Sequence, residues 1–181
     1  MSSLFDVGNE CIFSEDRRHR YTLRHVWDER LPPAMVIGLN PSTADEQKLD
    51  PTLRRVRGLL KADGFGSFVM TNLFAFRATD PKSMMCTDDR IGPANDSILR
   101  SVASEVLLAQ GRIIAAWGIH GSWKDRDKEV VRLLSPAELW VWELTDAGQP
   151  RHPLYLPGGT KLVKWIVDSP AAVPSKLGHA S

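Results

Sequence analysis

The sequence predicts an α/β fold: a three-layer α/β/α sandwich around a central, mainly parallel, four-stranded sheet, with a short N-terminal hairpin. Three observations support this class. Apolar runs at residues 34–39, 67–73, 112–117 and 139–144 have the length and composition of strands that are buried on both faces. Segments with apolar residues at helical spacing lie between these runs. A chain that alternates strands with helices favours a parallel sheet with helices on both faces.

In the first half of the chain, residues 11–14 and 21–27 flank a charged segment and predict two short strands around a turn. A helix is expected to follow the first apolar run. Asp50 is its predicted N-cap and Pro51 lies in its first turn, because both residue types favour those positions. Gly64 is expected to end it.

In the second half, residues 76–91 are polar and predict a long loop. Residues 93–111 predict a helix, because apolar residues recur at i, i+4 and i+8. A second helix is expected over residues 124–134 and a short third one around residues 162–167.

Length and composition predict one globular domain. The chain has 181 residues, of which 43% are hydrophobic and 25% are charged, a balance typical of globular proteins. A chain of this length suits one sizeable core rather than two. We therefore expect a single domain over residues 1–168 and a disordered tail over residues 169–181, which is rich in proline, alanine and serine.

The charge and the cysteine count exclude several classes of site. The formal net charge of +1 does not by itself indicate a nucleic-acid partner, so such binding would depend on local clusters. Cys11 and Cys86 are the only cysteines, too few to ligate an iron–sulfur cluster or a thiolate zinc site. Without a disulfide framework, a signal peptide or an apolar run of roughly 20 residues, we expect a cytoplasmic protein that does not span a membrane.

Residues typical of binding sites and turns stand where the predicted strands end. They are Asn40, Pro41 and Ser42 after the first strand, Asn72 at the second, Trp117 and Gly118 at the third, and His152 and Pro153 beyond the fourth. In open α/β sheets, ligands bind outside the carboxyl ends of the strands. We therefore expect two carboxamides and one imidazole to meet at one edge of the sheet.

These side chains are suited to cleaving a bond in a reactive substrate. Asn40 cannot take a proton near neutrality, but it can orient a water molecule. That suffices for an N-glycosidic bond, because the sugar becomes cation-like as the base leaves. His152 can donate to the departing anionic base. Asn72 has one donor and one acceptor with which to recognise a base.

Four motifs resemble the uracil-DNA glycosylase superfamily in order and spacing: GLNPS (38–42), TNLFAFRATDP (71–81), AAWG (115–118) and HPLYL (152–156). The resemblance extends over residues 34–156. It implies that Asn40 positions water, as in the asparagine-bearing mismatch glycosylases, and that Asn72 pairs with a flipped base. It also implies that His152 belongs to the motif after the final strand.

This chain departs from the glycosylase pattern at three places. Ser42 stands where the mismatch enzymes have glycine, and Leu154 where the third motif usually has serine. The hydroxyl-rich segment STADE (42–46) replaces the residues that shape the base pocket. The full chain also resembles a bacterial family of unknown function that carries GLNPSTAD, NLFAFRATDP and PRHPLYL. That second resemblance implies no established activity.

The residues and the resemblance together predict a site that contains neither a metal nor a cofactor. The expected partner is nucleic acid, DNA above all, or a small molecule that contains a nucleobase. The predicted catalytic residues are Asn40 and His152; the predicted substrate-binding residues are Gly38, Pro41, Ser42, Asn72, Arg77 and Pro153; the predicted contacts to the nucleic-acid backbone are Arg17, Arg20, Arg54 and Arg151.

Structural roles are the alternatives for these residues. Asn40 is an ordinary turn residue, and the clusters DRRHR (16–20) and LRRVR (53–57) are also typical of solvated surfaces. Asp45, Glu46 and Asp50 are interpreted as acids at a helix start, with a metal or base role as the alternative. Two other functions stay open: a module that binds modified bases without catalysis, and a hydrolase of free nucleosides or nucleotides.

Overall fold

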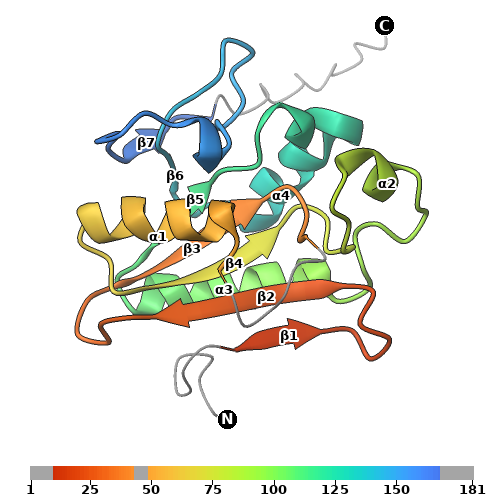
Figure 1. Cartoon of the computed structure of the whole chain (residues 1–181), viewed down its shortest axis with the longest axis horizontal. Helices are drawn as coiled ribbons and strands as arrows, with labels where there is room; N and C mark the ends of the chain where they lie inside the picture. The colour runs from red at the N-terminus through yellow and green to blue at the C-terminus, as the bar shows by residue number, and fades with distance from the viewer. Residues whose placement is uncertain (1–9, 43–48, 168–181) are drawn as a thin grey trace, which may run out of the picture.

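The computed structural model describes residues 10–42 and 49–167, and its centre is one mixed sheet of seven strands (Figure 1). The strand order across the sheet is β1-β2-β4-β3-β5-β6-β7. The strands are β1 (Cys11–Phe13), β2 (Arg20–Val26), β3 (Pro33–Gly38), β4 (Ser67–Asn72), β5 (Arg112–Ala115), β6 (Leu139–Val141) and β7 (Val163–Trp165).

The α/β class is confirmed, but the predicted four-stranded sheet was too small. The four predicted strands correspond to β4, β3, β5 and β6, which pair in parallel. The predicted hairpin joins the same sheet, since β1 pairs with β2 and β2 pairs antiparallel with β4. At the other edge β7 pairs antiparallel with β6.

In the described ranges, four α-helices and two 3₁₀ segments accompany the sheet. They are α1 (Pro51–Ala62), α2 (Pro81–Met85), α3 (Asn95–Leu108), η1 (Ile119–Asp125), α4 (Arg126–Leu134) and η2 (Pro153–Tyr155). Asp50 caps α1 as predicted: its Oδ1 accepts a hydrogen bond from the Leu53 amide at 2.8 Å. Gly64, with φ of 84°, follows the helix and turns the chain toward β4.

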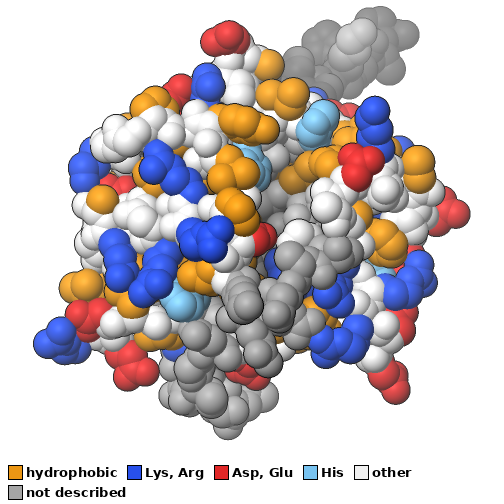
Figure 2. Space-filling view, viewed as in Figure 1, with side chains coloured by type: hydrophobic (Ala, Val, Ile, Leu, Met, Phe, Trp, Pro, Cys, Tyr) orange, Lys and Arg blue, Asp and Glu red, His pale blue; other side chains and the backbone are white. Residues whose placement is uncertain are grey.

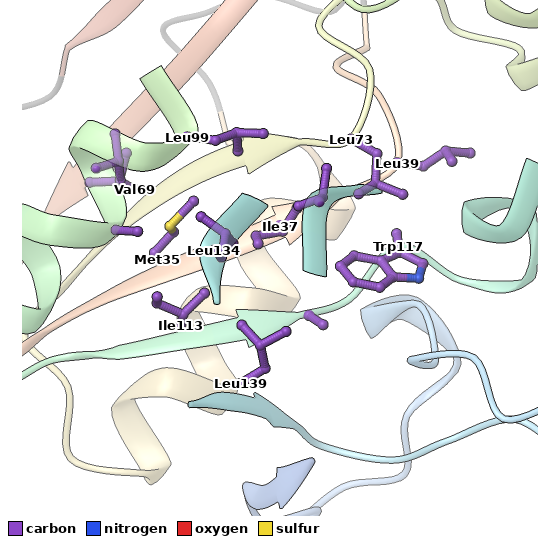
Figure 3. Packing of buried hydrophobic residues seen from close by; sticks show 14 of the residues in the cluster. Met35, Ile37, Leu39, Val69, Leu73, Leu99, Ile113, Trp117, Leu134 and Leu139 are labelled. Carbon is purple, nitrogen blue, oxygen red and sulfur yellow. The ribbon is translucent and has the colours of Figure 1, made fainter. Parts of the chain in front are cut away.

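The helices cover both faces of the sheet, and the pleat of β3 divides the core into two clusters. Met35 and Ile37 pack with residues of α3 and α4, as Figure 3 shows from close by. Ala34 and Val36, which alternate with them, pack with residues of α1 on the opposite face. All residues of β3 are buried, which explains the uninterrupted apolar run in the sequence.

Two predicted segments differ from the structure. Residues 163–165 form an edge strand instead of the predicted short helix, because they pair with β6 and place Trp165 against Trp117 at a centroid distance of 5.7 Å. Six residues of mixed pattern cannot decide between helix and strand without this pairing. The predicted loop 76–91 contains α2, which is capped by Asp80. The predicted tail 169–181 lies outside the described residues.

Candidate functional site

A cavity of about 600 Å³ opens at the carboxyl ends of β3, β4 and β5. Its volume lies in the range of small-molecule sites. The described residues that line it are Arg20, Gly38, Leu39, Asn40, Ser42, Asp50, Thr52, Leu53, Met70, Asn72, Ala78, Thr79, Pro81, Trp117, Gly118, Ile119, His120, Thr145, Arg151, His152 and Tyr155. The three residues expected to do the chemistry, Asn40, Asn72 and His152, therefore share one cavity.

Asn40 is half-buried just beyond the end of β3, and its amide orientation follows from its partners. Nδ2 donates to the carbonyl of Ala78 at 2.8 Å and to that of Pro41 at 3.2 Å. Two carbonyl acceptors identify this atom as the nitrogen. The acceptor Oδ1 has no partner within the described part of the chain. Asn40 thus both ties two loops together and leaves a carbonyl oxygen for a ligand or water.

Asn72 is the last residue of β4, and its side chain is 3% exposed. Its side-chain amide forms no hydrogen bond to any described residue. The residue lines the cavity, so its amide is available to a polar ligand there. Gly38 makes room for this side chain: a Cβ built there would lie 2.9 Å from Asn72 Oδ1.

Buried polar residues of α3 and α4 fix the backbone beside Asn72. Asn95 Nδ2 donates to the carbonyls of Asn72 and Leu73, both at 3.1 Å. Arg126 Nε donates to the same Leu73 carbonyl at 3.0 Å, and its guanidinium pairs with Asp96. The backbone at the end of β4 is therefore held by two helices that follow it in the chain.

We expect Gly38→Ala to displace Asn72, because the new methyl group would meet Asn72 Oδ1 and would lie 2.5 Å from Met70 Cε. Overpacking of this kind costs about 1–3 kcal/mol of unfolding free energy. Urea denaturation measures the loss. Gly58→Ala is the matched control, since nothing lies within 4 Å of its Cβ and mid-helix alanine stabilises by about 0.5–1 kcal/mol. Equal stability of Gly38→Ala and wild type would contradict the prediction.

His152 is half-buried at the start of η2 and is held as a neutral donor. Its Nδ1 accepts a hydrogen bond from the Leu154 amide at 3.3 Å, so the proton of the neutral ring resides on Nε2. Burial lowers the pKa of His152, while the charge of Asp50 acts in the opposite direction. Gly118, with φ of 75°, turns the chain after β5, and a Cβ added there would lie 3.4 Å from His152 Cβ.

Stability is expected to fall as the pH drops below about 6.5. Burial lowers the pKa of both His152 and His25 in the folded protein. The unfolded chain therefore binds more protons than the folded one in this pH window. As the pH falls, proton binding favours the unfolded state, and the free energy of unfolding decreases. Urea denaturation between pH 7.5 and 5.5 measures the slope. A combined His25→Gln and His152→Gln variant is expected to flatten it; an unchanged slope would contradict this cause.

The cavity carries charges of both signs. Arg20 is 4% exposed, and Arg151 forms an ion pair with Glu143 at 3.0 Å; both line it. The carboxylate of Asp50 is engaged by the Leu53 amide and by the hydroxyl of Ser42, which donates to Oδ2 at 3.3 Å. Asp50 therefore acts as a cap beside the site, as the sequence predicted.

Five predicted site residues do not line the cavity: Pro41, Pro153, Arg77, Arg17 and Arg54. The two prolines are buried and shape the turns around the site. The guanidinium groups of Arg77 and Arg17 both lie over the Phe13 ring, at 5.2 and 4.1 Å from its centroid. Arg54 is exposed on α1.

Several lining residues escaped the sequence-based prediction. They are the hydroxyl residues Thr52, Thr79 and Thr145, and the exposed apolar residues Ile119 and Tyr155. Tyr155 lies 5.8 Å from the His152 ring between centroids, and its place in the HPLYL motif was the one signal for it. The threonines carry no local pattern, since the first turn of α1 and two separate loops bring them together.

Neither a metal cluster nor a membrane-spanning helix is found in the described ranges 10–42 and 49–167. There, no group of three or more His, Cys, Asp or Glu side chains is arranged to hold a metal ion. No helix in this part of the chain is long and apolar enough to cross a bilayer. Asp45 and Glu46, the other acids considered as ligands, lie outside the described residues.

The comparisons with known proteins agree with the second resemblance seen in the sequence. No curated protein and no solved structure matches the chain. Residues 20–154, which include almost every lining residue of the cavity, match the family described as "Protein of unknown function (DUF1643)". The chain belongs to this family.

Proposed function

We propose that the protein hydrolyses the N-glycosidic bond of a damaged or modified base in nucleic acid. The observation that carries the proposal is the shared cavity of Asn40, Asn72 and His152. These side chains supply an acceptor for water, an unpaired amide for a base and a neutral N–H donor for a leaving group.

In the proposed reaction, the nucleotide is flipped out of the strand into the cavity. The bond between the sugar carbon C1′ and the base nitrogen breaks, and its electron pair stays with the base. His152 Nε2–H donates to the base as this negative charge develops. Asn40 Oδ1 accepts from a water whose oxygen bonds to C1′. The proton that water loses passes to solvent, and the base takes one up, so the products are free base and an abasic site.

The uracil-DNA glycosylase resemblance supports the same assignment. Its motifs GLNPS, TNLFAFRATDP and HPLYL contain the three key residues, Asn40, Asn72 and His152. The Asn72 amide, which has no hydrogen-bond partner among the described residues, gives a reason for an asparagine at a strand end where an apolar residue would pack without penalty.

The test is abasic-site formation on oligonucleotides that carry uracil, hypoxanthine or modified pyrimidines, read on gels after alkaline cleavage. We expect release of at least one such base, with Asn72→Ala losing base binding. Asn95→Ser serves as a comparison. It removes the hydrogen bond that Asn95 donates to the Asn72 carbonyl, and it keeps the side-chain amide of Asn72. Inactivity on the whole panel, with base binding unchanged in Asn72→Ala, would contradict the proposal.

A second candidate is a hydrolase of free nucleosides or nucleotides, favoured by the cavity volume of about 600 Å³, which exceeds the needs of a single base. Arg20 and Arg151 would then bind a terminal phosphate. Salt separates the two candidates, because affinity for DNA falls steeply as salt rises. A flat response from 50 to 200 mM NaCl favours the small substrate.

A further inference from the structure

Three cations follow one stripe of α1, beginning next to the cavity. Arg54, Arg57 and Lys61 are spaced at i, i+3 and i+7, which places them on the same side of the helix. The first turn of α1 contributes Thr52 and Leu53 to the cavity. Figure 2 shows Lys and Arg side chains gathered over α1 on this face of the molecule. A positively charged row therefore leads away from the site.

Acids of the described residues do not neutralise these charges. Within the described part of the chain, no carboxylate lies within ion-pair distance of Arg54, Arg57 or Lys61. Other surface cations do have such partners, as Lys128 does in Asp125 at 2.7 Å. An uncompensated row attracts polyanions more strongly than a surface of mixed sign.

His25 reports the same local charge. It lies beside the row, and its pKa is lowered first by burial and then by the positive charges of Arg57 and Lys61. The Trp27 ring lies 5.9 Å from the His25 ring between centroids. Both cations lie over the Trp27 ring, Arg57 at 5.9 Å and Lys61 at 5.7 Å from its centroid. The indole is fixed by its N–H bond to the Phe65 carbonyl at 3.0 Å. The two cations are thus held beside a rigid aromatic ring.

We propose that Arg54, Arg57 and Lys61 bind successive phosphates of the nucleic-acid strand whose target nucleotide enters the cavity. The seven-residue separation from Arg54 to Lys61 corresponds to about 10 Å along a helix. Three successive phosphates of one DNA strand are separated by two nucleotide steps, about 7 Å along the duplex axis at ~3.4 Å each, so the row is long enough to reach all three. The inference rests on the proposed function for the identity of the partner. It places the nucleic-acid strand along α1 on one side of the cavity.

The experiment measures binding and needs no turnover. A fluorescein-labelled 20-mer with undamaged bases, single-stranded or duplex, is titrated with the protein, and its anisotropy is followed between 50 and 200 mM NaCl. For the triple variant R54A/R57A/K61A we expect affinity to fall at least about tenfold. We also expect the slope of log K against log [NaCl] to decrease by about two to three, since each phosphate contact adds roughly 0.7–0.9. Alanine favours the helix, so α1 should remain folded.

The matched control is K82A/R100A/R132A, which removes the same charge from α2, α3 and α4, where the described residues offer these side chains no ion pair. Its affinity and salt slope should equal those of wild type. Wild-type binding by the α1 variant, equal losses in both variants, or no binding of the oligonucleotides by wild type would overturn the proposal. Loss of binding in the α1 variant without base release by wild type would leave the strand path intact and reject the base-removal reaction alone.

Discussion

Replacing Asn40 by alanine is expected to reduce the rate of base release by about 10²-fold or more, because a misplaced nucleophile loses this much rate. The proposed role of the residue is to hold water through Oδ1, while Nδ2 is engaged by the Ala78 and Pro41 carbonyls. A single-turnover gel assay with enzyme in excess measures the rate. Ligand binding through Asn72 should persist, so the effect should appear in the rate and not in the affinity.

A purely structural Asn40 would also lose activity on truncation, so a second variant is needed. Asn40→Asp keeps an acceptor oxygen and removes the donor that bonds to Ala78. If water orientation is the role, Asn40→Asp should retain far more activity than Asn40→Ala at neutral pH. If the tie between the loops is the role, the two variants should be equally impaired and equally destabilised in urea, and the water-positioning role would be wrong.

Replacing His152 by leucine is expected to lower the rate by about 10²–10³-fold, the usual effect of removing one donor from a developing negative charge. The imidazole is suited to this because Nδ1 is occupied by the Leu154 amide and burial lowers its pKa, which leaves a neutral ring with Nε2–H available. Single-turnover rates on the best substrate of the panel measure the effect.

His152→Gln is the conservative control, because its amide keeps an N–H donor on a side chain of comparable reach. We expect it to recover part of the activity lost in His152→Leu. Since Asn72 would still contact the base, both variants should bind substrate with near wild-type affinity. A glutamine variant no better than leucine, together with a loss of substrate binding in both, would assign His152 to cavity shape instead of leaving-group stabilisation.

The central strands and the start of α1 could be predicted because local chemistry determines them. β3 is buried on both faces. A strand that is apolar on both faces avoids water only when helices cover the sheet above and below it. Asp50 and Pro51 have side chains whose local geometry favours a helix start in almost any context.

The sheet edges could not be predicted in the same way. Residues 163–165 form a strand only because β6 offers unpaired backbone groups at that edge. The two clusters of arginines show the same limit. The sequence suggested phosphate contacts for Arg17 and Arg77, but both guanidinium groups lie over Phe13. The proposed phosphate contacts of Arg57 and Lys61 depend instead on their positions beside Trp27 and His25, which belong to another part of the chain.

The sequence by itself determined the α/β class, the four parallel strands and the positions of Asn40, Asn72 and His152 at the ends of the chain segments that form the site. These properties follow from hydrophobic pattern and from the rule that parallel strands share one carboxyl edge. Only the tertiary structure decided which side chains keep free hydrogen-bonding groups there. Among the described residues, the Asn72 amide has no hydrogen-bond partner, whereas Asn40 engages its Nδ2 and leaves its Oδ1 open. Residues from distant loops and helices decide this, because they fill or leave the space around each amide.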